Sequence, residues 1–321
     1  MEFTVVPENY ALLEQGLRYD IDFGEVRSSV DIAVRDLTAN RTVATLRFAD
    51  TAAVSLDIAP YVRRLFRPQP VVAGRTGCFG ENRLVTVALE VDGVRSPMRT
   101  YTLLTVDGLA RMLTTLPRRR TIAAGEFDEI PIYAPEGGMV YVDAEYASGV
   151  HSNRPFQVER SAAFALFRLA ADDFSDAVTV RVTLEASGRT DEVVYEVVRR
   201  NAGSRRLAWV ASSGEIAAYT FPTCCKERLK VDKVRFYAGE EGYRTTGISA
   251  SRSCTLVSDY EPRAMIEALD EVLAAPRVWL VSGTTLSEVD VVSSECSHSF
   301  DGTLNSVAVE IRDRKREEVT L

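Results

Sequence analysis

The sequence is short of histidine. His151 and His298 are its only two histidines in 321 residues. A metal centre built from several histidines is therefore excluded, and a Cys–His catalytic pair has few possible members. The five cysteines are odd in number and scattered, and Cys224 is followed directly by Cys225, so neither a disulfide framework nor a zinc site is indicated. We expect reduced thiols, and neither a bound metal nor a cofactor.

Long apolar runs are absent as well. No stretch approaches the roughly 18 apolar residues that cross a bilayer, so we expect no membrane span. The N-terminal residues 1–4 (Met-Glu-Phe-Thr) lack the basic segment and apolar core of a secretory signal peptide. The sequence therefore predicts a protein made in the cytoplasm without a signal peptide.

Clustered positive charge is scarce. The chain carries a formal net charge of −8, whereas a nucleic-acid site needs grouped Lys and Arg to displace counterions, so we expect no nucleic-acid partner. Arg118, Arg119 and Arg120 form the one dense basic cluster. They follow Pro117, which favours a solvated linker at this point.

Signatures of common enzymes are missing. There is no G-x-S-x-G elbow, and the glycine-rich segment 74–80 lacks the Lys-Ser/Thr ending of a phosphate-binding loop. We interpret that segment as a flexible loop whose Phe79 could touch a partner. His298 lies between two serines, but strand neighbours point to opposite faces, so the adjacency does not indicate catalysis. The adjacent carboxylate pairs are interpreted as surface charge, namely Asp172-Asp173, Glu240-Glu241 and Asp270-Glu271.

Period-two alternation of apolar and polar residues dominates the first part of the chain, and it predicts strands. A short helical turn with a proline near its start is expected at residues 59–66, and a second short helix at 106–113. The expected strands are 29–36, 42–48, 53–58, 83–91 and 98–104, with a hairpin turn at 37–41 and another at 92–93.

The next part, 118–203, is also rich in strands. Its best hairpin pairs residues 177–186 with 189–198 around a Ser-Gly turn. Strands are further expected at 130–133 and 139–146. The apolar segment 164–169 fits either a buried strand or a short helix.

The last part, 204–321, has the clearest helix signal. Ser258 and Glu261 match a capping box, and apolar residues then recur at helical spacing up to Pro276. We predict a helix over 258–275 packed on a sheet through Met265, Ile266, Leu269, Val272 and Leu273. The remaining expectations are strands at 207–210, 218–221, 229–237, 277–280, 288–292 and 304–311, a polar ribbon at 244–253, a turn at 301–302 and a frayed charged tail at 312–321.

These patterns predict a mainly β fold. The expected domains are two tandem Ig-like β-sandwich domains, at residues 1–117 and 118–203, and a C-terminal α+β domain at residues 204–321. The α+β domain carries one helix packed on a sheet.

The last part carries a set of aromatic and turn residues: Trp209, Gly214, Tyr219-Thr220-Phe221, and the segments 256–260, 276–280 and 304–306. This pattern resembles that of phage and prophage virion proteins from gut Bacteroidetes, which look like tail or baseplate-associated components built of β-sandwich modules. The usual Trp-x-Asn opening is here Trp-Val-Ala, and the acidic residue before the tyrosine is replaced by Ala218. The resemblance implies no catalytic residue, but it implies fold-defining roles for Trp209, Gly214, Tyr219, Phe221, Trp279 and Asn305.

Three hypotheses of function follow. The first is a structural subunit of a phage tail, baseplate or related particle, which is no enzyme, forms homo-oligomers and contacts other virion proteins. The second is a cell-surface adhesin or carbohydrate-binding β-sandwich protein that binds a glycan through exposed aromatic residues. The third is a hydrolase, which would need two convergent carboxylates or a Cys–His pair in a concave pocket.

Overall fold

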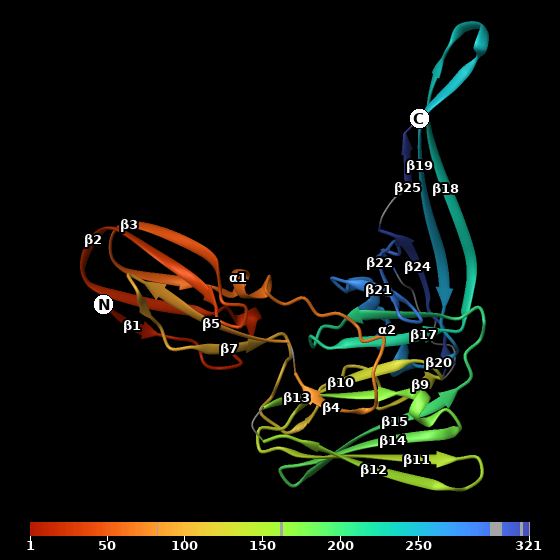
Figure 1. The fold of residues 1–321 in the computed structure, drawn as a ribbon, viewed down its shortest axis with the longest axis horizontal. Coiled ribbons are helices and arrows are strands. Elements are labelled where there is room, and N and C mark those ends of the chain that lie inside the picture. Colours follow the sequence, from red (N-terminus) through yellow and green to blue (C-terminus); the bar gives the residue numbers. More distant parts are fainter. Residues whose placement is uncertain (82, 161–162, 296–303, 315–316, 321) are drawn as a thin grey trace. The chain divides into compact units, whose positions relative to one another are not determined.

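The computed structural model describes residues 1–321 except 82, 161–162, 296–303, 315–316 and 321 (Figure 1). The fold is mainly β, as the sequence predicts. The chain forms two compact units, one made of residues 1–69 and 81–107 and the other of residues 70–80 and 108–321. No helix in the described residues is both long and apolar enough to span a membrane.

The first unit is built around the long antiparallel hairpin of β2 and β3. Its sheet has the order β1-β2-β5-β6, with β3 also paired to β2 and β7 to β5. Its hydrophobic cluster includes Tyr19, Ile32, Val87 and Tyr101. The elements are β1 (Glu2–Val5), a 3-10 turn (Leu13–Gln15), β2 (Arg18–Asp36), β3 (Arg41–Asp57), α1 (Ala59–Arg63), β5 (Leu84–Val91), β6 (Val94–Arg95) and β7 (Arg99–Thr102).

The hairpin turn predicted at 37–41 is confirmed, since Asp36 pairs with Arg41. The separation of 42–48 from 53–58 is wrong, because both belong to β3. Backbone pairing with β2 carries the strand through this region, and a register irregularity absorbs the break in alternation. The short helix with an early proline is confirmed as α1, with Pro60 in its first turn.

The second unit begins with two sheets that share one hydrophobic cluster. One sheet has the order β4-β13-β10-β8 and the other β12-β11-β14-β15-β9. Inward residues of both sheets form the cluster, among them Ile132 and Phe167 from one and Val142 and Val182 from the other. The elements are β4 (Gly77–Gly80), β8 (Arg111–Met112), β9 (Arg119–Ala123), β10 (Phe127–Tyr133), β11 (Gly138–Tyr146), β12 (His151–Val158), β13 (Phe164–Ala170), a 3-10 turn (Ala171–Phe174), β14 (Ala177–Ala186) and β15 (Arg189–Val198).

Three expectations for this region are corrected or settled. The helix expected at 106–113 is wrong, because Arg111 and Met112 pair with β10 as strand β8. The solvated linker at 118–120 is also wrong, since β9 runs parallel to β15 and its Arg120 is buried. The ambiguous segment 164–169 is a strand, and the hairpin of β14 and β15 closes between Ala186 and Arg189 as predicted.

The rest of the second unit is a long curled sheet with a helix against it. The sheet order is β17-β16-β21-β22-β24-β19-β18, and β25 pairs with β19 beyond β24. The elements are β16 (Arg205–Val210), β17 (Ile216–Phe221), β18 (Thr223–Tyr237), a 3-10 turn (Gly239–Glu241), β19 (Tyr243–Val257), β20 (Glu261–Pro262), α2 (Arg263–Ala274), β21 (Val278–Ser282), β22 (Thr285–Val291), β23 (Leu304–Asn305), β24 (Ala308–Asp313) and β25 (Glu317–Thr320).

Helix α2 packs its apolar face as predicted, with Met265, Ile266, Leu269 and Val272 buried in the hydrophobic cluster. The capping box is wrong, because α2 begins at Arg263 and no side chain caps it. Both capping residues have other partners. The Ser258 hydroxyl accepts the backbone N–H of Val307 at 2.9 Å, and the Glu261 carboxylate accepts the Tyr219 hydroxyl at 2.8 Å.

The frayed tail expected at 312–321 is also wrong. Strand β24 continues to Asp313, and Glu317–Thr320 form β25 along β19. Pairing with β19 supplies the backbone hydrogen bonds that a free charged tail would take from water. The turn expected at 301–302 lies outside the described residues.

The hydrophobic clusters follow the three parts of the sequence. Their buried residues lie within 13–101 in one cluster and within 110–195 in another, and the third joins Leu116 to residues 207–311. The second unit contains the last two clusters. The three-domain division stays a prediction. Buried polar contacts connect the two clusters of the second unit, for example the Arg206–Glu126 ion pair.

Candidate functional site

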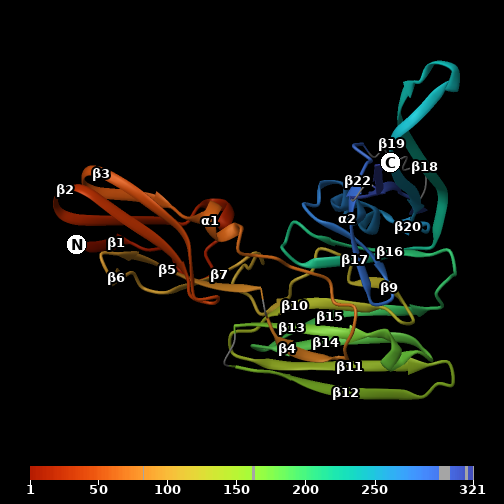
Figure 2. The ribbon, with the colours of Figure 1, turned by 45° about the horizontal axis from the view of Figure 1, so that its top comes forward.

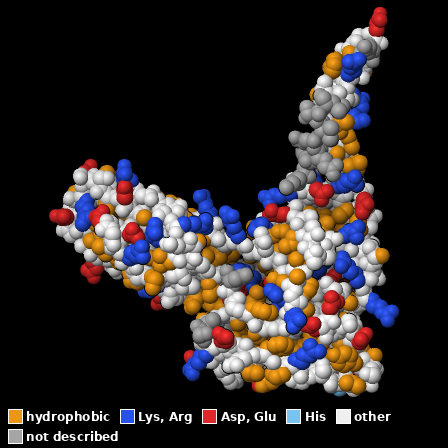
Figure 3. Space-filling model, in the orientation of Figure 1, with side chains coloured by type: hydrophobic (Ala, Val, Ile, Leu, Met, Phe, Trp, Pro, Cys, Tyr) orange, Lys and Arg blue, Asp and Glu red, His pale blue; other side chains and the backbone are white. Residues whose placement is uncertain are grey.

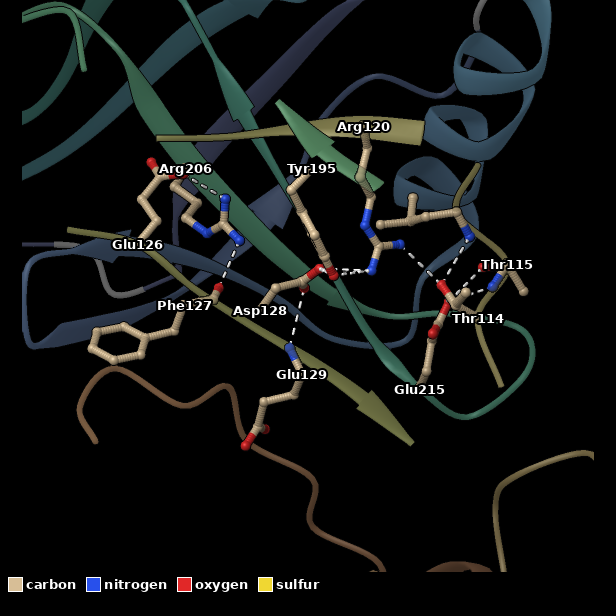
Figure 4. Close-up of polar contacts among 11 residues, drawn as sticks. Thr114, Thr115, Arg120, Glu126, Phe127, Asp128, Glu129, Tyr195, Arg206 and Glu215 are labelled. Carbon is tan, nitrogen blue, oxygen red and sulfur yellow. Dashed lines mark hydrogen bonds and ion pairs between the residues drawn. The ribbon is translucent and has the colours of Figure 1, made fainter. Parts of the chain in front are cut away.

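Arg206 forms the first of two buried polar connections inside the second unit (Figure 4). It extends from β16, and its Nη1 lies 2.8 Å from the Glu126 carboxylate while its Nη2 donates to the carbonyl of Phe127 at 2.8 Å. Glu126 also accepts the Thr220 hydroxyl at 2.7 Å. Strands β16 and β17 are thereby tied to the turn that leads into β10.

Arg120 forms the second connection, from strand β9 (Figure 4). Its Nη2 lies 2.6 Å from Asp128 and 2.7 Å from the Tyr195 hydroxyl, which itself donates to Asp128 at 2.6 Å. Its guanidinium also lies over the Tyr195 ring, 5.0 Å from the centroid. Burial raises the pKa of Tyr195 well above its ordinary value, so the phenol stays a donor at neutral pH.

Glu215, in the turn between β16 and β17, extends this connection to the segment before β9. One of its oxygens accepts the backbone N–H of Thr115 at 2.5 Å and the hydroxyls of Thr114 and Thr115 at 3.1 and 2.9 Å. Burial raises the pKa of Glu215, while Arg120 and the threonine donors partly oppose that shift. Thr114 also accepts from Arg120, so the two groups share a partner.

These contacts act as structural cross-links. Their carboxylates accept hydrogen bonds from arginine, tyrosine or threonine donors of the second unit. The cavity beside Glu126 and Arg206 has a volume of about 30 Å³, room for a water or two and far below a ligand site. Removing one partner of such a buried ion pair typically costs about 3–5 kcal/mol of stability.

The most distinctive surface feature of the second unit is a long hairpin, which we call the arm and define as residues 226–253 of β18 and β19. It extends well past the curled sheet in two views (Figures 1 and 2). Side chains of β18 are exposed along nearly its whole length. Among the described residues, β18 pairs only with β19, so its outer edge presents free backbone donors and acceptors.

The arm is rich in exposed apolar side chains, which Figure 3 shows interleaved with Lys and Arg. Their exposure ranges from 41% at Val231 to 75% at Tyr243, and Leu229, Val234, Phe236 and Tyr237 lie between these values. Isolated hydrophobic residues are ordinary on a protein surface, but a concentration on one projecting element with a free strand edge is typical of a protein contact.

A pocket lies at the root of the arm, where β18 and β19 leave the sheet. We call it the root pocket; its volume is about 350 Å³. Its apolar lining includes Leu280, Ile311 and Cys254, and burial raises the pKa of the Cys254 thiol to about 12, so that thiol is neutral at physiological pH. Four arginines also line it: Arg205, Arg228, Arg252 and Arg312.

The residues expected to define the fold lie as follows. Trp209 and Phe221 are fully buried, and Tyr219 and Trp279 nearly so. Gly214 has a φ of +82° in the turn between β16 and β17, a conformation that favours glycine. Asn305 lies in β23, and its side chain accepts the backbone N–H of Ser306 at 2.8 Å. Trp209, Tyr219 and Phe221 share one hydrophobic cluster, in which the rings of Tyr219 and Phe221 meet with centroids 5.0 Å apart, whereas Asn305 lies in the separate β20-β23 pair.

Several of the other candidate residues contact side chains or backbone of distant segments. Phe79 is half-exposed in β4, which replaces the expected flexible loop, and Arg168 lies over its ring at 4.6 Å. In the adjacent carboxylate pairs, Asp173 accepts the Thr76 N–H at 2.9 Å and Glu271 accepts the Ser212 hydroxyl at 2.7 Å. His151 is exposed at the start of β12, whereas His298 lies outside the described residues.

No group of three His, Cys, Asp or Glu side chains in the described part of the chain is arranged to hold a metal ion. Sequence reasoning missed the buried cross-links and the root pocket. Alternation offered no signal for the cross-links, since Arg120 falls in the basic cluster and Asp128 and Arg206 lie just before the strands expected at 130–133 and 207–210. Comparison with known protein families and with curated proteins finds no match for this chain.

Proposed function

We propose that this chain is a structural subunit of a phage tail, baseplate or related particle, acting through protein–protein contacts and without catalytic turnover. The observation that carries the proposal is the arm. A hairpin that leaves its sheet, keeps one strand edge free and exposes aliphatic and aromatic side chains gains stability when a partner covers it.

Two further features support an assembly role. The buried ion pairs of Arg120 and Arg206 connect strands within the second unit from which the arm extends, which suits a subunit that transmits contacts in a particle. We also propose that the strands of both units form tandem Ig-like β-sandwich modules, followed by an α+β module around α2. Stacked β-modules are a common way to build an extended subunit.

The test is to ask whether the chain enters a particle. Virions purified from a host that carries the gene are analysed by mass spectrometry and by electron microscopy with an antibody against the chain. The matched variant replaces residues 229–252 by Asn-Gly, which closes the hairpin on the Arg228–Ser253 pair.

We expect the full chain in the particle and the shortened chain left in the soluble fraction. A stable monomer at high concentration, from a gene with no particle genes beside it, contradicts the proposal.

A second candidate is a carbohydrate-binding protein or adhesin, favoured by the aromatic residues of the arm. Tyr237 and Tyr243 are both exposed, and their rings meet edge to face with centroids 5.4 Å apart. Exposed rings of this kind can stack on sugar faces. A glycan array separates the candidates, because a saturable glycan signal that Tyr243→Ala abolishes favours the adhesin.

A further inference from the structure

The tip of the arm, residues 236–243, combines aromatic rings with acidic groups. Phe236, Tyr237 and Tyr243 are 48%, 68% and 75% exposed. The edge-to-face packing of the two tyrosines holds their rings in place, so little side-chain entropy is lost when a partner covers them. Glu240 is exposed in the turn and gives the tip an acidic side chain.

The root pocket combines an apolar floor with four arginines. Glu227 and Asp313 also line it, and Glu310 and Asp290 lie beside its arginines, so four carboxylates stand against the four arginines. Three of the arginines have carboxylate neighbours. Arg205 lies 4.0 Å from Glu227, Arg228 lies 3.6 Å from Glu310, and Arg312 pairs with Asp290. Arg252 is exposed and makes no ion pair with any residue the structure describes. The volume of about 350 Å³ falls within the range of ligand sites.

A tip cannot reach the root pocket of its own chain. The strand ladder runs from the Arg228–Ser253 pair to the Tyr237–Tyr243 pair with one irregularity between Val234 and Arg235. At about 3.3 Å per residue, nine residues of strand hold the tip roughly 30 Å from the root. The complementary surfaces therefore meet only when the tip comes from another molecule.

We propose that the arm tip of one copy docks in the root pocket of a second copy of this chain. Tyr243 and its aromatic neighbours cover the apolar floor, and Glu240 pairs with Arg252. The contact joins two different surfaces, so a pair of copies still has one free tip and one free pocket. Further copies can add at these surfaces until a ring closes, or without end in a fibre. The inference rests on the proposed function and names the partner that the arm contacts.

The test reverses one charge on each side of the contact and measures self-association of the full chain by sedimentation velocity. Glu240→Arg and Arg252→Glu should each raise the dissociation constant by at least about tenfold, because like charges then face each other. Both positions are exposed, so the fold should be kept, which circular dichroism checks. Glu185→Arg, an exposed charge reversal on β14, is the matched control and should leave association unchanged.

Mixing the two variants gives the decisive measurement. The Arg252→Glu chain keeps a normal tip and the Glu240→Arg chain keeps a normal pocket, so an equimolar mixture should recover association that neither variant shows alone. Symmetric pairing of two β18 edges predicts no recovery.

A wild-type chain that stays monomeric at high concentration overturns the inference, as do two variants that associate like the wild type. In either case, incorporation of the chain into particles leaves the proposed function standing, with a different protein as the partner of the arm.

Discussion

Arg120 and Tyr195 illustrate how single residues decide the architecture of the second unit. A run of three arginines after a proline is normally solvated, and Arg118 and Arg119 do keep exposed side chains. Arg120 points to the face of β9 opposite Arg119 and is buried against Asp128 and Tyr195. Alternation along β9 thus separates Arg119 at the surface from Arg120 in the interior, while Arg118 precedes the strand.

The Tyr195 hydroxyl makes a testable contribution to alkaline stability. Burial raises its pKa, so ionisation is favoured only in the unfolded chain. The stabilisation is complete below the unfolded value of about 10 and is lost as the pH rises above it. We expect Tyr195→Phe to lower the free energy of unfolding by about 1–3 kcal/mol near neutral pH, through loss of a buried hydrogen bond.

Above about pH 10, the unfolding free energy of Tyr195→Phe should decline less steeply than that of the wild type. Urea titration followed by tryptophan fluorescence measures this, since both tryptophans of the chain lie in the second unit. Parallel pH profiles for the two proteins would refute the role of this phenol. Tyr219→Phe is the comparison variant, because burial also raises the pKa of Tyr219. The difference between the two pH profiles shows how much of the change in unfolding free energy is specific to Tyr195.

At the scale of elements, α2 and the arm show opposite uses of apolar residues. The helix buries its apolar face in a hydrophobic cluster, so those residues stabilise the fold. The arm carries apolar residues in strand alternation, yet no second layer covers either face among the described residues. The same kind of sequence therefore supplies a core in one element and a contact surface in the other.

Leu269 tests the contribution of α2. It is fully buried, and Leu269→Ala should lower the free energy of unfolding by about 2–5 kcal/mol, because lost burial adds to the cost of a cavity. Leu229→Ala is the matched control on the arm, where the side chain is 54% exposed, and should change stability by less than about 0.5 kcal/mol. Equal losses in urea titrations of the two variants would contradict this division of roles.

At the scale of the whole molecule, the second unit is not continuous in sequence. Residues 70–80 belong to it, although the residues on both sides belong to the first unit. Strand β4 within this segment pairs with β13 from Ala165 to Arg168. Cys78 of β4 also packs against the hydrophobic cluster between the two sheets.

A fragment that starts at residue 108 should therefore be incomplete. Without β4, the edge of β13 loses its backbone partners, and we expect the melting temperature of fragment 108–321 to fall by on the order of 5 °C. The comparison is the same fragment with residues 70–80 joined to residue 108 by a flexible Gly/Ser linker. Calorimetry that gives the same melting temperature for both would show that β4 adds nothing to the stability of this unit.

Local side-chain patterns are enough to locate several elements of this protein. Period-two alternation located the hairpin of β14 and β15, and helical spacing located the buried face of α2. These signals are local, since each depends on side chains within one or two elements.

Which surfaces meet depends on the tertiary fold, because burial involves residues far apart in the chain. The fold places β4 beside β13, buries Arg120 and Arg206 in carboxylate pairs, and leaves β18 exposed. Alternation in β18 predicts a strand whether or not a second layer packs on it. The residues of β18 do not indicate which of the two occurs.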